Sequence, residues 1–373
     1  MSLPEPNSFF KQKRSFSDVK QHLLSAYLET WFTTYLAEAP EPQGIRYIDL
    51  QTDDATDALN TPTAFDALAQ CLAKKEKLRE ILSLHLHHPD QAVLQKQLEL
   101  LQTSPAFRLL HAVPAALVEE ESRQEFLNAL PDAPALLVMD PFRNPFALET
   151  LQQALPQAAA DILMLFSPES MHKALSARKS SPALAALLGT RLQKIQDLLK
   201  KEKSKARKQE FMAEQLRQVM QHAGRFTLLL QVNLPDASQA DHFILFATRH
   251  KQAYKSFKAI LQEYSDYQPD GVLSFKANQG SPQLVLFQDQ HLYSLHNLVA
   301  SLAQAGAQFK YKSVEKIYEE HHLGTNYTKE NYLAAFEELR RADKVELLNP
   351  KTLQAIRKPT YASVVKYKLI ASG

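Results

Sequence analysis

Glycine is scarce in this chain, and its scarcity limits the ligand-binding loops that the chain can build. The 373 residues include only 8 glycines, whereas average usage near 7% would give about 26. The closest pair, Gly271 and Gly280, is nine residues apart. Phosphate-binding loops and nucleophile turns need glycines at short fixed offsets, because only glycine lets the backbone turn that tightly or approach a ligand that closely. The sequence therefore excludes the dinucleotide fingerprint, the Walker loop and the G-x-S-x-G turn of hydrolases.

Charge, cysteine content and hydropathy narrow the class of protein further. The net charge of +2 implies no partner by itself, and the single cysteine, Cys71, permits neither an intrachain disulfide nor a cysteine-built metal site. Cys71 lies among apolar residues at helical spacing, which favours a structural role over a nucleophilic one. The chain opens without a basic segment followed by an apolar stretch, and no apolar run approaches the roughly 18 residues of a membrane helix. We therefore expect a cytoplasmic protein with no membrane segment and no metal.

Short apolar runs alternate with helical patterns through the first part of the chain. We expect strands at 45–50, 80–86, 107–112, 135–140, 161–166, 226–232 and 242–248, and helices at 64–78, 92–101, 122–129, 147–155 and, with Ser17 as its cap, 9–38. This alternation predicts an α/β fold with a mostly parallel sheet between two layers of helices. Only nine residues separate the last two strands, so we expect an antiparallel pair at the sheet edge. By topological analogy, this is the layout of the Rossmann class I methyltransferase fold.

Residues 183–223 form a long helical insertion with a basic segment. Lys194 to Lys208 holds seven basic residues, Lys200 and Lys201 among them, and two acids. Such a segment is typical either of a solvated helix face or of a surface that contacts a polyanion.

The pattern changes at about residue 290, where three short helices and two strands at 344–348 and 363–370 predict a C-terminal winged helix. Ser313 and Thr328 are the expected caps of its second and third helices. The third helix has mixed charges, but the ribbon from residue 347 onward has five basic residues and no acid: Lys351, Arg357, Lys358, Lys366 and Lys368. The winged helix is therefore either a module that contacts DNA or RNA through a basic wing, or one that packs against protein. We expect a core domain at 1–289 and a winged-helix domain at 290–373.

Several short motifs, in this order, resemble one known family. They are Phe9-Phe10-Lys11, Ser17-Asp18-Val19-Lys20, Tyr27-Leu28, Trp31-Phe32, Tyr47-Ile48-Asp49-Leu50, Met139-Asp140-Pro141-Phe142 and residues 243–248, followed by Tyr254, Phe257 and Lys258. Together they resemble the three-Cys-motif partner protein family (TcmP). The resemblance implies a bacterial protein with a methyltransferase-like Rossmann core, a C-terminal winged helix and a separate three-cysteine-motif protein as its partner.

The chain departs from the family pattern where the cofactor S-adenosylmethionine would bind. Asp49 is present after the first strand, but the G-x-G turn that follows it in the family is replaced by residues 52–55, which include Asp53 and Asp54. Side chains there would crowd the cofactor, and the two aspartates would repel its carboxylate, although they would attract its sulfonium. After the second strand, where an acid usually accepts the ribose hydroxyls, the chain has His87.

The fourth strand ends in a better match to the family. Asp140, Pro141 and Phe142 are present, and Arg143 replaces a glycine. In amino-methylating enzymes a polar residue and a proline here position the target nitrogen, while an aromatic ring stacks on the base. We therefore name Asp140, Pro141 and Phe142 as the candidate catalytic residues, and Asp49, Asp53, Asp54 and His87 as the altered cofactor site. The simpler alternative for Asp140 is that it caps the turn after the strand.

Three functions remain open at this stage. The first is a degenerate methyltransferase-like partner, non-catalytic or weakly active, that binds a protein or a nucleic acid. The second is an active S-adenosylmethionine-dependent nucleic-acid methyltransferase with an altered cofactor loop. The third is a nucleic-acid scaffold that combines the wing, the basic insertion and the N-terminal cluster of Lys11, Lys13, Arg14 and Lys20.

One further cluster has the composition of a metal site. His85 and His87 share one face of the second strand, with His88 opposite and Asp90 close by. Two imidazoles and a carboxylate can bind zinc or iron, but a polar strand end explains the same residues.

Overall fold

A computed structural model of the chain describes residues 14–38, 44–51, 63–177, 181–233, 240–278 and 292–368. The chain divides into two compact units. Unit 1 comprises Met1–Tyr264 with Lys276–Ser281, and unit 2 comprises Ser265–Phe275 with Pro282–Gly373. No helix in these described ranges is long and apolar enough to cross a membrane.

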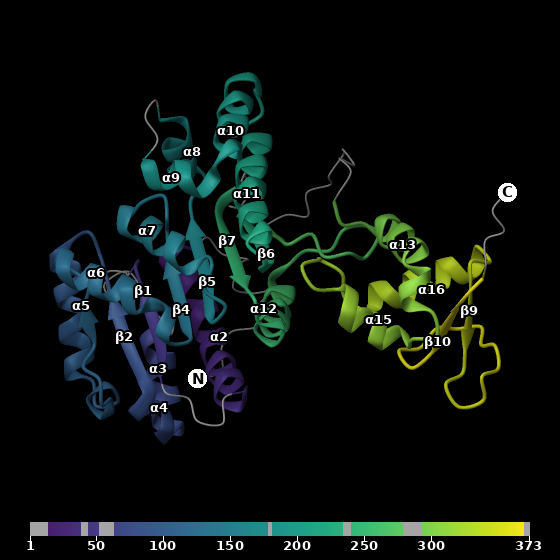
Figure 1. The fold of residues 1–373 in the computed structure, drawn as a ribbon, viewed down its shortest axis with the longest axis horizontal. Helices are drawn as coiled ribbons and strands as arrows, with labels where there is room; N and C mark the ends of the chain where they lie inside the picture. Colours follow the sequence, from purple (N-terminus) through teal and green to yellow (C-terminus); the bar gives the residue numbers. More distant parts are fainter. Residues whose placement is uncertain are drawn as a thin grey trace. The chain divides into compact units, whose positions relative to one another are not determined.

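The described part of unit 1 is built on an eight-stranded sheet in the order β3-β2-β1-β4-β5-β7-β6-β8 (Figure 1). Its strands are β1 (Ile45–Asp49), β2 (Leu82–Leu86), β3 (Ala115–Ala116), β4 (Ala135–Met139), β5 (Ala160–Phe166), β6 (Phe226–Asn233), β7 (Ala240–Thr248) and β8 (Lys276–Asn278). β7 runs antiparallel to its neighbours β5 and β6, and the other adjacent pairs are parallel. The prediction of an α/β fold with a mostly parallel sheet is confirmed.

Two details of the predicted sheet are wrong. The reversed strand β7 is not at the edge, because it lies between β5 and β6, and β8 pairs with the far side of β6. Residues 243–247 are fully buried, as expected of a strand with neighbours on both sides and helices on both faces. The run 107–112 is not a strand either. Phe107–Leu109 forms a 3-10 turn, because a short apolar run does not by itself distinguish strand from helix.

Helices cover both faces of the sheet. They are α2 (Phe16–Glu38), α3 (Ala64–Lys74), α4 (Glu76–Ile81), α5 (Gln91–Thr103), α6 (Glu120–Ala129), α7 (Pro145–Ala154), α8 (Pro168–Ser176), α9 (Pro182–Leu188), α10 (Thr190–Lys201), α11 (Lys205–His222) and α12 (Lys251–Tyr264), with a second 3-10 turn at Leu130–Asp132. On one face the Phe246 ring contacts Tyr27 of α2 and Phe257 of α12, with ring centroids 5.5 and 4.3 Å apart.

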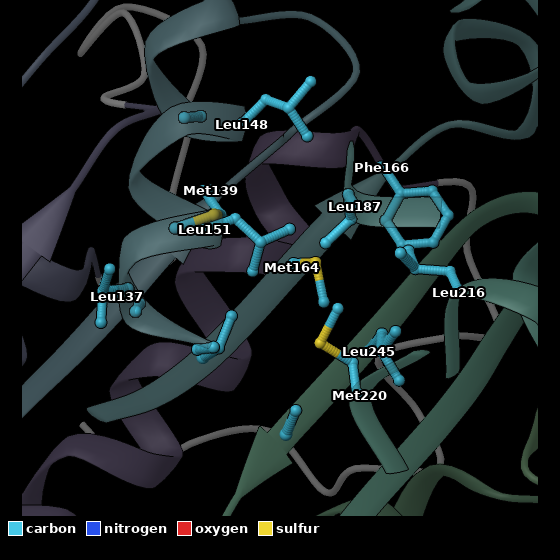
Figure 2. Packing of buried hydrophobic residues seen from close by; sticks show 14 of the residues in the cluster. Leu137, Met139, Leu148, Leu151, Met164, Phe166, Leu187, Leu216, Met220 and Leu245 are labelled. Atoms are coloured by element: carbon cyan, nitrogen blue, oxygen red, sulfur yellow. The ribbon is translucent and has the colours of Figure 1, made fainter. Parts of the chain in front are cut away.

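The opposite face carries the largest apolar cluster of unit 1. Met139 of β4, Met164 of β5 and Leu245 of β7 meet Leu151 of α7 and Met220 of α11 (Figure 2). Leu245 and Phe246 are adjacent in the chain and lie on opposite faces of the sheet, because side chains alternate along a strand. This alternation explains why the central strands are apolar at nearly every position.

Polar caps set the starts of several helices, because the first N–H groups of a helix have no partner inside it. Thr63 accepts from Asp66 N at the start of α3, and Asn144 accepts from Phe146 N at the start of α7. The expected cap of the first helix is wrong by two residues. The Ser15 hydroxyl, not that of Ser17, accepts from Asp18 N, at 3.0 Å.

Unit 2 contains short helices and a two-stranded antiparallel ribbon. Its elements are α13 (Leu295–Gln304), α14 (Gly306–Phe309), α15 (Val314–His321), α16 (Lys329–Arg341), β9 (Val345–Leu348) and β10 (Val364–Tyr367). Ser313 caps α15, as predicted, and also pairs with Val364 beside the ribbon. Thr328 begins α16, where its N–H donates to Asn331 Oδ1 at 2.8 Å. Leu298, Ile317, Phe336 and Val365 are among the residues that form its core.

Candidate functional site

Three neighbouring strands of unit 1 end beside one another at one edge of the sheet. β1 ends at Asp49, His87 follows β2, and Asp140 follows β4. β2, β1 and β4 are adjacent and parallel, so their carboxyl ends share an edge. The strand order reverses between β1 and β4, and doubly wound sheets bind ligands in the crevice outside the carboxyl ends at such a reversal. This edge is therefore the candidate site.

Asp49 is held in a buried ion pair. Lys20 Nζ of α2 lies 2.9 Å from Asp49 Oδ2, and the two side chains are 0% and 3% exposed. Lys20 Nζ also donates to the Gln51 carbonyl, and the Gln51 N–H donates to Asp49 Oδ1 at 2.9 Å. The chain's own groups therefore neutralise and hydrogen-bond this carboxylate. We expected Lys20 to belong to an N-terminal basic cluster that contacts nucleic acid, but its side chain is fully buried.

His87 is fixed by neighbouring groups on both sides of its ring. Its Nδ1 lies 2.6 Å from the Leu117 carbonyl oxygen, and its ring packs on Phe146 with centroids 5.1 Å apart. Burial lowers the pKa of His87, and the bonds to Leu117 and to the Asn144 side chain partly oppose that shift. The imidazole is therefore neutral at pH 7. It lacks the charge with which a carboxylate would bind two ribose hydroxyls.

The two carboxylate oxygens of Asp140 have different surroundings. Phe142 N donates to Asp140 Oδ1 at 2.9 Å, so the aspartate does cap the turn after β4. The other oxygen, Oδ2, is buried and has no hydrogen-bond partner among the described residues. Burial raises the pKa of Asp140 to about 6, despite the opposing backbone N–H groups of Phe142 and Arg143 and the nearby Arg143 charge. A buried acceptor without a donor is costly and uncommon in folded proteins.

The other two candidate catalytic residues, Pro141 and Phe142, come directly after Asp140 in the chain. Pro141 is buried, whereas Phe142 is half-buried and its ring contacts Phe166 with centroids 5.2 Å apart. The Phe142 side chain is thus partly accessible and lies two residues after Asp140.

Asn144 joins the strand ends, and sequence reasoning missed it. Its side chain donates to the Leu50 carbonyl after β1 at 3.1 Å, and it hydrogen-bonds the His87 ring after β2. It also caps α7 through Phe146 N. The Asn-Pro pair at 144–145 signals a helix start, but nothing in the sequence indicates the contacts to β1 and β2.

The histidine cluster after β2 does not assemble as a metal site in the described residues, where no three His, Cys, Asp or Glu side chains converge. His85 packs on Phe126, with ring centroids 5.2 Å apart. Asp90 caps α5 by accepting from Ala92 N at 2.9 Å. Cys71 is buried, and burial raises the pKa of its thiol to about 11.

The remaining candidates fall into three groups. Asp53, Asp54, Lys11 and Lys13 lie outside the described residues. The basic residues of the wing divide further. Lys366 pairs with Glu346 at 2.8 Å and Lys368 pairs with Asp343, whereas the other three cations of the predicted wing, Lys351, Arg357 and Lys358, are exposed. Lys200 and Lys201 are exposed at the end of α10.

Comparisons with known proteins do not assign this chain to a family. No family model matches the chain, and no curated protein matches it. Among solved structures, the chain is similar to protein LPL1258 of Legionella pneumophila, which the family model DUF519 describes. The two are 12% identical, with a TM-score of 0.36 over 67% of this chain and 91% of that one. A likeness this weak supports no conclusion about activity, and membership of the TcmP family stays a prediction.

Proposed function

We propose that this chain is a methyltransferase-derived protein that binds an amino-bearing nucleobase of a nucleic acid and has lost or weakened its own methyl transfer. The sheet supports this proposal, because it is mostly parallel, reverses its strand order between β1 and β4 and contains one antiparallel strand, β7, although that strand is not at the expected edge. The TcmP resemblance implies the same core. Unit 2, with its helices and antiparallel ribbon, is proposed as the winged helix of that family, and a three-cysteine-motif protein as the partner.

One observation carries the proposal: Oδ2 of Asp140 is buried and has no hydrogen-bond partner among the residues that the structure describes. A carboxylate oxygen at this place is an acceptor for a ligand N–H, and the exocyclic amino group of a base is such a donor. The half-buried Phe142, two residues further on, is the aromatic side chain that we propose contacts the same base. The part of the site that receives an amino group is thus retained.

The described residues do not fit S-adenosylmethionine in the usual way. The Asp49 carboxylate already binds Lys20, so receiving the cofactor's ammonium would require breaking a buried ion pair. His87 is bonded to Leu117 and Asn144, and it replaces the acid that would bind the ribose. These two features favour a binding partner over an active enzyme, and we derive no transfer step through the cofactor.

Base recognition is tested by competition between two RNA oligonucleotides that differ only at one nucleoside. One contains a single adenine, and the other contains purine riboside, which lacks the amino group. A hydrogen bond to a charged group contributes about 1.5–3 kcal/mol, so we expect about a 10- to 100-fold preference for adenine. Asp140→Asn should abolish that preference, because its amide can present an N–H where Oδ2 accepted one. Asp197→Asn makes the same change in charge on α10 and should keep it.

Calorimetric titration with S-adenosylmethionine and S-adenosylhomocysteine tests the second part of the proposal, that the chain does not bind the methyl-donor cofactor. We expect no binding at millimolar ligand. Micromolar binding would replace our proposal with the alternative of an active S-adenosylmethionine-dependent nucleic-acid methyltransferase. Equal affinity for the adenine and purine oligonucleotides would instead remove the role assigned to Asp140.

A further inference from the structure

The turn between α10 and α11 is the most concentrated positive segment in the described chain. We call residues 200–208 the basic tip. It holds six basic residues and one acid, Glu202, so its net charge is +5. The six are Lys200, Lys201, Lys203, Lys205, Arg207 and Lys208.

The basic tip extends past the packed part of the two helices. Leu199 before it and Gln209 after it are buried, whereas Lys201, Lys203 and Lys205 between them are exposed. These three lysines make no ion pair with any described residue. Lys200 lies 3.9 Å from Asp197, an exposed pair that contributes little. The positive charge of the tip is therefore largely uncompensated within the part of the chain that the structure describes.

The sequence of the tip opposes local helix stability. α11 begins at Lys205, its first turn contains no acid, and its Ser204 cap is followed by Arg207 and Lys208. Cations at the amino end of a helix are unfavourable because they face the positive end of its dipole. A local rule that is broken on an exposed surface is often found at a functional site. The pKa of Glu202 is lowered, first by the Ser204 N–H and then by the surrounding cations.

The topology places the basic tip at the same edge of the sheet as Asp140. α11 packs on β6 and β7 and leads into β6, which runs parallel to β5. A helix that precedes a strand in such a layer runs opposite to it, so its amino end lies at the carboxyl edge of the sheet. Figure 1 shows α10 and α11 rising beyond the strands.

We propose that the basic tip binds the phosphate backbone of a nucleic acid and thereby holds the strand at the edge where Asp140 lies. This docking surface deepens the proposed function and rests on it for the identity of the bound base. No aromatic or large aliphatic residue occurs in residues 200–208, so the tip lacks the groups that insert into a membrane. It also lacks groups suited to reading bases, so its binding should be independent of sequence and strongly dependent on salt.

The test separates the basic tip from the base site by using an abasic oligodeoxynucleotide of about 20 nucleotides as probe. Its binding to the full chain is measured by fluorescence anisotropy from about 50 to about 300 mM KCl. The variant Lys201→Gln/Lys203→Gln/Lys205→Gln removes three cations. Each lost phosphate contact lowers the salt slope by about 0.7 for a single strand, so we expect the slope to fall by about 2 and the affinity at low salt to fall at least about tenfold.

The matched control is Lys77→Gln/Lys96→Gln/Lys251→Gln, which removes the same charge from exposed positions on α4, α5 and α12. It should keep most of the affinity and the slope. Equal losses in both triple variants, or no loss in the tip variant with its melting temperature unchanged, would overturn the proposal. Poly-glutamate of similar length that competes as well as the oligonucleotide would also overturn it, in favour of an acidic protein partner. Asp140→Asn should leave abasic binding unchanged, so failure of the base site and failure of the tip are distinguishable.

Discussion

Replacing Lys20 by methionine tests how the first strand of the candidate site is held. The variant keeps the length of the side chain but removes the ammonium that lies 2.9 Å from Asp49 Oδ2. It leaves a carboxylate that is only 3% exposed without its counter-charge. The Gln51 N–H still donates to Asp49, but the interaction with Nζ and the bond to the Gln51 carbonyl are lost.

The expected magnitude follows from the burial of both partners. Removing one member of a buried ion pair typically costs about 3–5 kcal/mol. The free energy of unfolding of a natural domain is about 5–15 kcal/mol, so Lys20→Met should remove about a fifth or more of it. Asp49→Asn in the same chain should recover part of this loss, because no unpaired charge then remains buried.

Urea unfolding of the wild type, both single variants and the double variant gives the coupling energy between the two residues. Lys74→Met is the control, because its pair with Glu29 has both side chains 57% exposed and should be worth at most about 1 kcal/mol. A loss for Lys20→Met no larger than that of Lys74→Met would refute the view that this pair holds the end of β1.

Three further predictions concern pH and packing. Burial raises the pKa of Asp140 from 3.8 to about 6, so the folded protein loses stability as pH rises through this interval. Asp140→Asn should therefore gain up to about 3 kcal/mol on the wild type at about pH 7 and nothing at about pH 4, in urea titrations at both pH values. Burial lowers the pKa of His85 from 6.5 to about 4, so the wild type loses stability as pH falls through that range, and His85→Leu should reduce the slope of unfolding free energy against pH by about one proton. Parallel profiles for the two proteins would contradict this. A methyl group on Gly306 would lie 2.9 Å from the Tyr367 ring, whereas one on Gly44 would lie 3.9 Å from its nearest neighbour. Gly306→Ala should therefore cost about 1–3 kcal/mol in calorimetric melting while Gly44→Ala is tolerated, and equal effects would rule out the clash.

Periodicity predicted the layers of unit 1 well, because long alternating segments leave few ways to bury apolar surface. It was less reliable for short segments. The run 107–112 is apolar enough for a strand, but its beginning forms a 3-10 turn whose Phe107 ring contacts Phe65, with centroids 6.1 Å apart. β7 lies inside the sheet because it pairs with both β5 and β6, and β8 then pairs with the far side of β6. The sequence does not show where a strand as short as β8 will pair.

The candidate site was found in part from the sequence. Asp49 and Asp140 were named from the family resemblance, and His87 was named because it stands where an acid usually binds the ribose. The parallel sheet does bring these three strand ends to one edge. Asn144 was missed because its bond to the Leu50 carbonyl spans 94 residues of sequence. No local pattern encodes a contact of that separation.

The sequence by itself determined the class of fold, the absence of every glycine-dependent phosphate loop, and the identity of the acids at the strand ends. It did so because composition and periodicity are local properties. Only the tertiary structure decided which of those acids is available to a ligand. Lys20, 29 residues before Asp49, is buried against that carboxylate and neutralises it, whereas Oδ2 of Asp140 is buried with no donor among the described residues. Burial and pairing are set by the packing of distant segments, and they give two chemically identical carboxylates opposite roles.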